Sequence, residues 1–69
     1  MKELQAATMK ARKSSGNQMV GTRVSGGLFQ IVEWDLKDNI TAISRFMTMQ
    51  DCIARLNGYP ANRSDLMDA

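Results

Sequence analysis

Side chains that commonly carry out chemistry are scarce in this sequence. Its 69 residues include one cysteine and no histidine, so a metal centre of histidine and cysteine ligands cannot be built within one chain. Cys52 has no imidazole base to activate it as a nucleophile. It falls on the apolar side of a predicted helix, where we expect it to fill space in the core. The sequence predicts no catalytic residue, no cofactor and no metal site.

The remaining reactive groups have no partners at a useful spacing. Glu33 and Asp35 share one side of a predicted strand, spaced like a pair of ligands for a divalent cation. Neither a third ligand nor a phosphate-binding loop accompanies them, so we expect surface charges. Ser14 and Ser15 follow Lys13, but nothing in the segment suggests the rigid support that a catalytic site needs. The pattern predicts a protein that is not an enzyme.

Positive charge is concentrated at the start of the chain. Residues 1–15 contain four basic residues and one acidic residue, whereas the rest contains five basic and six acidic residues. Lys10, Arg12 and Lys13 could contact nucleic acid or steer the chain toward an acidic protein surface. The alternative is a solvated arm without a binding role.

Residues 18–46 have the pattern of a three-stranded antiparallel meander. Turn residues at 25–27 and 37–39 predict two three-residue loops, which would pair Val24 with Leu28 and Leu36 with Ile40. The even-numbered residues then share one face, and a slip of one residue in either hairpin would scatter them. We expect that face to form the core, from Val20, Val24, Leu28, Val32, Trp34, Leu36, Ile40, Ala42 and Phe46.

A helix should follow the meander and cover this even face. Thr48 is positioned to cap its first turn, the apolar residues between Met49 and Leu56 recur at helical spacing, and Gly58 should end it. The fold class is therefore α+β: a three-stranded meander with one C-terminal helix on one face, plus a marginal basic N-terminal helix or arm. The expected divisions are an arm at 1–17 that ends in a turn at 14–17, a domain at 18–59, and a tail at 60–69 with a final turn near Asp65.

The opposite, odd-numbered face of the sheet is too apolar to face water alone. Its predicted contact residues are Arg23, Phe29, Ile31, Ile43 and Arg45. Three alternatives could cover this face. They are the N-terminal arm, a second copy or another protein, and a single-stranded nucleic acid that stacks on Phe29 and contacts both arginines through its phosphates.

No motif ties the sequence to a named family, so the expected function rests on this second face. We expect a small non-enzymatic regulator that binds, and inhibits or modulates, a protein partner with an acidic surface, in the manner of accessory proteins of phages or mobile elements. A homodimer is expected because so short a chain buries little core. The alternative is a basic nucleic-acid-binding protein. Six methionines, a lone cysteine and the lack of a long apolar run favour a cytoplasmic protein without membrane or small-molecule partners.

Overall fold

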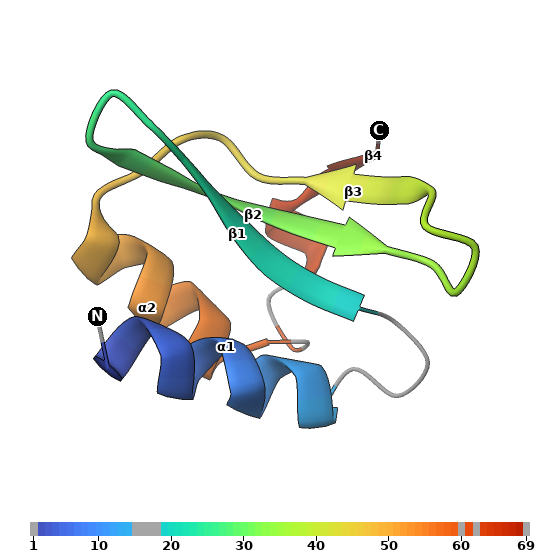
Figure 1. The fold of residues 1–69 in the computed structure, drawn as a ribbon, viewed down its shortest axis with the longest axis horizontal. Coiled ribbons are helices and arrows are strands. Elements are labelled where there is room, and N and C mark those ends of the chain that lie inside the picture. The colour runs from blue at the N-terminus through green and yellow to red at the C-terminus, as the bar shows by residue number, and fades with distance from the viewer. Residues whose placement is uncertain (1, 15–18, 60, 62, 69) are drawn as a thin grey trace.

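A computed structural model describes residues 2–14, 19–59, 61 and 63–68. Two α-helices lie against one face of a four-stranded antiparallel sheet whose strand order is β1-β2-β3-β4 (Figure 1). The elements are α1 (Lys2–Ser14), β1 (Met19–Ser25), β2 (Leu28–Trp34), β3 (Ile40–Ile43), α2 (Met49–Asn57), a 3₁₀ turn (Arg63–Asp65) and β4 (Met67–Asp68). The predicted α+β class is confirmed. The predictions of three strands and one packed helix are corrected to four strands and two helices.

The first hairpin has a different register from the predicted one. Ser25 pairs with Leu28 across a two-residue turn, in which Gly26 and Gly27 both have positive φ (58° and 79°). Two consecutive residues with positive φ make the turn whose twist matches a hairpin, and glycine adopts this backbone without a steric penalty. The predicted pairing of Val24 with Leu28 is therefore wrong by one residue.

The second turn also differs from the prediction. Trp34 pairs with Ile40 next to a bulge, and the intervening loop is held by the Asp35 carboxylate, which accepts hydrogen bonds from the backbone N–H groups of Lys37 (2.8 Å) and Asn39 (2.9 Å). Asp38 takes the left-handed conformation, with φ of 64°. Leu36 was predicted in the core but is 75% exposed in this loop.

The shifted register reverses the two faces of β2. Ile31 and Phe29 pack with Val20 against the helices, in the core, whereas Trp34 lies on the opposite face, over Gly21. The predicted inward Trp34 and outward Phe29 are thus exchanged. The predicted core residues Val24, Leu28, Ile40 and Phe46 are also exposed, between 40% and 62%. Val20 and Ala42 are buried on the helix side as predicted, whereas Val32 is buried on the opposite face.

The first helix is an integral part of the core. Leu4, Ala7 and Ala11 are almost completely buried and belong to the same apolar cluster as Cys52 and Leu56 of α2. The narrow apolar stripe of α1 is sufficient because alanine side chains let two helices approach closely. The expected marginal arm is therefore a 13-residue packed helix. The predicted turn at 15–17 and the strand start at 18 lie outside the described residues.

The second helix follows the sequence closely. The Thr48 hydroxyl accepts a hydrogen bond from the Asp51 backbone N–H (3.2 Å), and Gly58 caps the other end. The chain that precedes this helix bridges back to β2 at Phe29 and Met47. After the helix, Tyr59 is buried, and the chain returns to the sheet, where Met67 pairs with Ile43. The predicted tail thus contributes a fourth strand.

Candidate functional site

The structure does not bring the five predicted contact residues together on one surface. Ile31 is 2% exposed, and it and Phe29 pack in the core beneath the helices. Arg23 and Ile43 lie on the opposite face of the sheet, and Arg45 is exposed between β3 and α2. The predicted patch is therefore corrected: the one-residue shift moved its apolar centre inward.

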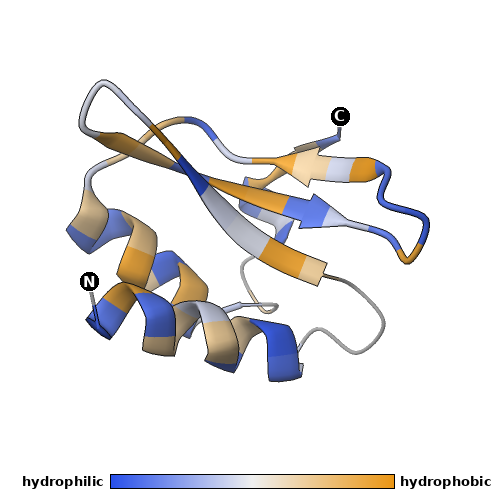
Figure 2. Cartoon of the chain, viewed as in Figure 1, coloured by the Kyte–Doolittle hydropathy of each residue, from blue (hydrophilic) through white to orange (hydrophobic). Residues whose placement is uncertain are grey.

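A different apolar surface takes its place on the helix-free side of the sheet, which we call the open face. In Figure 1 both helices lie below the sheet, and apolar residues recur along all the longer strands in Figure 2. Met19, Leu28 and Met67 are 45%, 43% and 55% exposed. The open face consists of Met19, Arg23, Leu28, Trp34, Ile43 and Met67, around the buried Val32.

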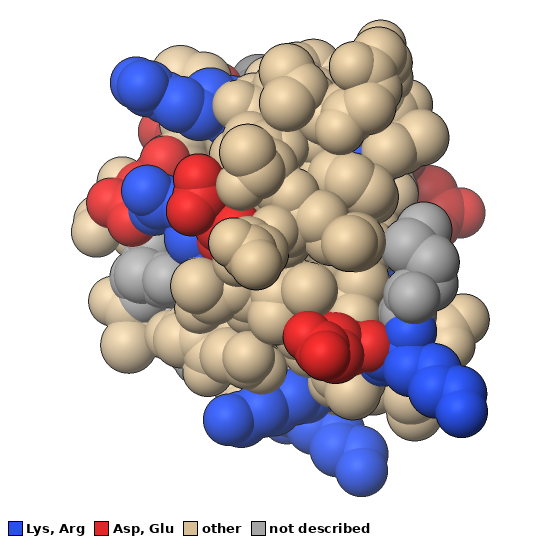
Figure 3. Space-filling view, turned by 90° about the vertical axis from the view of Figure 1, so that its left-hand side faces the viewer, with Lys and Arg blue, Asp and Glu red and all other residues tan. Residues whose placement is uncertain are grey.

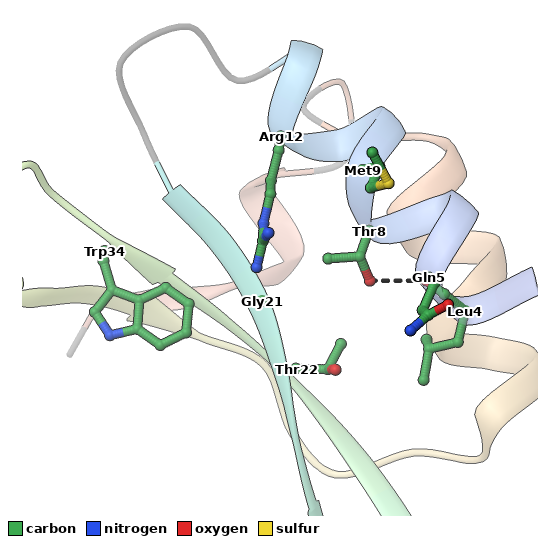
Figure 4. A pocket seen from close by; sticks show the side chains of 8 residues that line it. All are labelled: Leu4, Gln5, Thr8, Met9, Arg12, Gly21, Thr22 and Trp34. Atoms are coloured by element: carbon green, nitrogen blue, oxygen red, sulfur yellow. Dashed lines mark hydrogen bonds between the residues drawn. The ribbon is translucent and has the colours of Figure 1, made fainter. Parts of the chain in front are cut away.

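A groove of about 630 Å³ runs between α1 and the outer edge of β1 (Figure 4). From α1 it is bordered by polar and apolar side chains, and from the sheet by Gly21, Thr22 and Trp34. The α1 residues are Leu4, Gln5, Thr8, Met9 and Arg12. Only one of the eight lining residues, Arg12, is charged.

Arg12 joins the helix to the strand at one end of this groove. Its Nε donates a hydrogen bond to the Val20 carbonyl (2.7 Å). A Cβ atom at Gly21 would lie 2.8 Å from Trp34 Cζ3 and 3.7 Å from Arg12 Nη2. The indole ring and the guanidinium group therefore approach the same point of β1, as Figure 4 shows, and the missing side chain of Gly21 makes room for them.

The three predicted electrostatic contact residues lie on α1, and all are exposed. Lys10 and Lys13 lie on the helix surface, whereas Arg12 faces β1. Figure 3 views the end of the molecule that carries the β1–β2 hairpin; Lys and Arg side chains project from its lower, helical layer, and basic atoms also project at the upper left. These three basic residues of α1 thus lie in the helical layer, whereas Arg23 is the exposed basic residue of β1.

The most elaborate polar cluster surrounds Glu33, which is completely buried on the helix side of β2. Its carboxylate accepts hydrogen bonds from Arg63 Nε (2.8 Å), Arg63 Nη2 (2.7 Å) and the Thr41 hydroxyl (3.0 Å). The hydroxyl of the buried Tyr59 donates to it as well. This Glu33 cluster ties β2, β3 and the C-terminal segment together, and a buried carboxylate with this many donors is electrostatically satisfied.

The pKa values of the cluster follow from these contacts. The hydrogen bond from Arg63 is the largest cause of a lowered pKa for Glu33; it outweighs burial, which raises that pKa, and the bonds from Tyr59 and Thr41 act with Arg63. Burial and the neighbouring Glu33 carboxylate raise the pKa of Tyr59 to about 12. Glu33 is thus held as an anion and Tyr59 as a neutral donor.

Sequence reasoning placed Glu33 on the surface and assigned no role to Tyr59 or Arg63. These partners are 26 and 30 residues away along the chain, so no local spacing indicates that they meet. Cys52 is buried as expected, and burial raises the pKa of its thiol. Within the described part of the chain, no group of three or more His, Cys, Asp or Glu side chains is placed to hold a metal ion.

None of the helices in the described residues has the length and apolar character needed to cross a membrane. A scan against protein-family models, a search of curated proteins and a search of solved structures each found no match to this chain. The functional argument therefore rests on the two surfaces above, the open face and the groove beside β1.

Proposed function

We propose that this chain is a small non-enzymatic protein that binds another protein and thereby modulates it. The observation that carries the proposal is the open face, where Met19, Leu28 and Met67 expose between 43% and 55% of their surface on one side of the sheet. Exposed apolar side chains gathered on one face of a sheet are typical of protein contacts. Arg23, which is exposed at its edge, supplies the polar part and favours an acidic partner.

The reactive groups of the chain support a binding role over a catalytic one. The thiol of Cys52 is buried and its pKa is raised, which makes it a poor nucleophile. The Glu33 carboxylate already accepts hydrogen bonds from three side chains. The Cys52 thiol and the Glu33 carboxylate thus both contribute to the structure of the folded chain.

The proposal is tested with two sets of charged substitutions. The double variant Leu28→Glu with Met67→Glu places carboxylates on the open face, and Leu36→Glu is the control, because Leu36 is 75% exposed in the β2–β3 loop. Each tagged protein is used to capture partners from extracts of the cells that produce it, followed by mass spectrometry. We expect the wild type and Leu36→Glu to retain the same partner and the double variant to lose it.

Two outcomes would contradict the proposal. Equal capture by all three proteins would show that the open face is not the contact. Loss of capture after nuclease treatment would favour the alternative, a nucleic-acid-binding role for Lys10, Arg12 and Lys13, because the captured proteins would then be bridged by nucleic acid. Circular dichroism of each variant establishes that it is folded.

A further inference from the structure

The outer edge of β1 leaves backbone groups open to an added strand. β1 is an end strand of the sheet, and among the described residues no backbone pairs with its outer side. A two-residue turn makes Ser25 and Leu28 a hydrogen-bonded pair, so the alternation of an antiparallel ladder directs the N–H and C=O groups of Val20, Thr22 and Val24 outward. The hydrogen bond from Arg12 to the Val20 carbonyl agrees with this direction.

The groove beside α1 runs along the same edge. Thr22 borders it from the sheet, and Met9 and Thr8 border it from the helix. An extended peptide that adds to a sheet edge gains backbone hydrogen bonds from the strand, while pockets beside the strand accept its alternate side chains. With a volume of about 630 Å³, the groove has room for such side chains.

Charge selects the chemistry of the occupant. Arg12 is the charged residue of the groove. Lys13 is one helical turn beyond Met9, so it lies at the outer rim, and Arg23 is exposed on β1 itself. No acidic residue lines this part of the described structure, so the edge attracts an anionic segment.

The same charges disfavour a second copy of this chain. The longest self-pairing of two β1 strands is antiparallel and centred on Thr22. It would place Arg23 of each copy opposite Gly21 of the other, where the guanidinium group of Arg12 already lies. Two like-charged groups would then meet on each side of the central Thr22 pair, which destabilises the pairing.

We propose that the outer edge of β1 and the adjoining groove bind an extended acidic segment of a partner protein by strand addition. The segment pairs with the backbone of Thr22 and Val24. It does not pair with Val20, because the Val20 carbonyl already accepts a hydrogen bond from Arg12. One carboxylate of the segment lies beside Arg12. This inference rests on the proposed protein-binding function and adds a second surface to it, which adjoins the open face at Trp34.

The test uses two synthetic peptides and the full chain. One peptide alternates valine and threonine with a glutamate at each end, and its twin has lysines in place of the glutamates. We expect the acidic peptide to slow amide hydrogen exchange at Thr22 and Val24, measured by nuclear magnetic resonance, and the basic twin to leave those amides unchanged. The amides of Gly21 and Arg23, which face β2 in the same ladder, serve as internal controls.

Two variants examine the backbone and charge contributions separately. Thr22→Pro removes an outward N–H but no bond to β2, a position where an edge strand tolerates proline; we expect peptide binding to weaken by about tenfold, the upper range for one backbone hydrogen bond. Thr22→Val keeps the N–H and should bind like the wild type. Arg12→Glu should reverse the preference toward the basic twin, and this variant keeps the test decisive if Thr22→Pro does not fold.

Three results would overturn the inference. The first is unchanged exchange at Thr22 and Val24 with the acidic peptide in millimolar excess. The second is equal protection by both peptides, and the third is protection that appears with rising protein concentration alone, which would identify a second copy as the occupant. If the peptide instead perturbs Leu28 and Met67, strand addition fails while the proposed binding through the open face stands.

Discussion

Gly21 is required by the position of a single aromatic ring. An added Cβ would lie 2.8 Å and 2.9 Å from two carbon atoms of the Trp34 ring, closer than van der Waals contact allows. Space therefore favours glycine at this position, whereas positive φ favours glycine at Gly26 and Gly27. Within one short strand and its turn, glycine is thus favoured once by a lack of space and twice by the backbone conformation.

Gly21→Ala should displace the indole ring. We expect a loss of about 1–3 kcal/mol in the free energy of unfolding, the range for overpacking, together with a shift of tryptophan emission. Trp34 is the only tryptophan, so urea unfolding followed by fluorescence reports both. Gly27→Ala is the control: its Cβ would meet nothing within 4 Å, so it should lose stability through backbone strain and leave the folded-state emission unchanged. Unchanged emission in Gly21→Ala would contradict the placement of Trp34.

The residue scale is also where the sequence was least informative. The contact between Glu33 and Arg63 spans 30 residues, and a glutamate in a strand of alternating polarity is most simply read as exposed. Asp38 takes the positive φ, in a loop whose backbone N–H groups are held by the Asp35 carboxylate. The contact between Glu33 and Arg63 depends on the tertiary fold, which no local pattern encodes.

At the scale of the elements, prediction succeeded where local signals were independent of pairing. The Thr48 cap, the spacing of Cys52 and Leu56, and Gly58 place α2 correctly, because each signal acts within one turn of helix. The strands were also located, but their register was not. Ser25 pairs with Leu28 instead of belonging to the loop, and that single step exchanged the roles of Phe29 and Trp34.

The contribution of α1 depends on small residues at its contact with α2. Ala7 is 2% exposed, whereas the neighbouring Ala6 is exposed, which provides a matched pair of substitutions. We expect Ala7→Leu to lower the free energy of unfolding by about 1–3 kcal/mol, because extra methyl and methylene groups would separate two packed helices. Ala6→Leu should change it by less than about 0.5 kcal/mol. Chemical denaturation of both variants measures the difference, and equal effects would mean that α1 is not packed as described.

At the scale of the whole molecule, the helical layer and the sheet have different roles. The helices and the helix side of the sheet hold the core, so the open face and the edge of β1 are the surfaces that we propose for contacts with other molecules. The Glu33 cluster closes the C-terminal end of this arrangement, since Arg63 reaches back to β2 after the chain has left α2. A molecule of this size buries limited apolar area, so this polar closure should carry a measurable share of the stability.

The contribution of the Glu33 cluster to the free energy of unfolding should decrease as the pH falls. The pKa of Glu33 is lowered from its ordinary value of 4.5, so its ionised form stabilises the fold above that value, and this stabilisation is lost as pH falls through the lowered pKa. Arg63→Met should therefore cost about 1–2 kcal/mol near neutral pH, at the lower end for hydrogen bonds to a charged group because the arginine is half exposed. The cost should shrink as the pH falls through the lowered pKa of Glu33, since Glu33 becomes protonated in the wild type as well.

Urea unfolding of the wild type and Arg63→Met from neutral to acid pH measures the difference in their free energies of unfolding, which should decrease. Arg55→Met is the matched control: Arg55 pairs with Asp65, and both side chains are substantially exposed (43% and 53%). A surface pair of this kind contributes about 0–1 kcal/mol, so its removal should cost less than the removal of Arg63. A gap between wild type and Arg63→Met that stays constant from neutral to acid pH would mean that the Arg63 guanidinium stabilises the fold through packing alone, and the buried carboxylate would then not be the group that holds the C-terminal segment to the sheet.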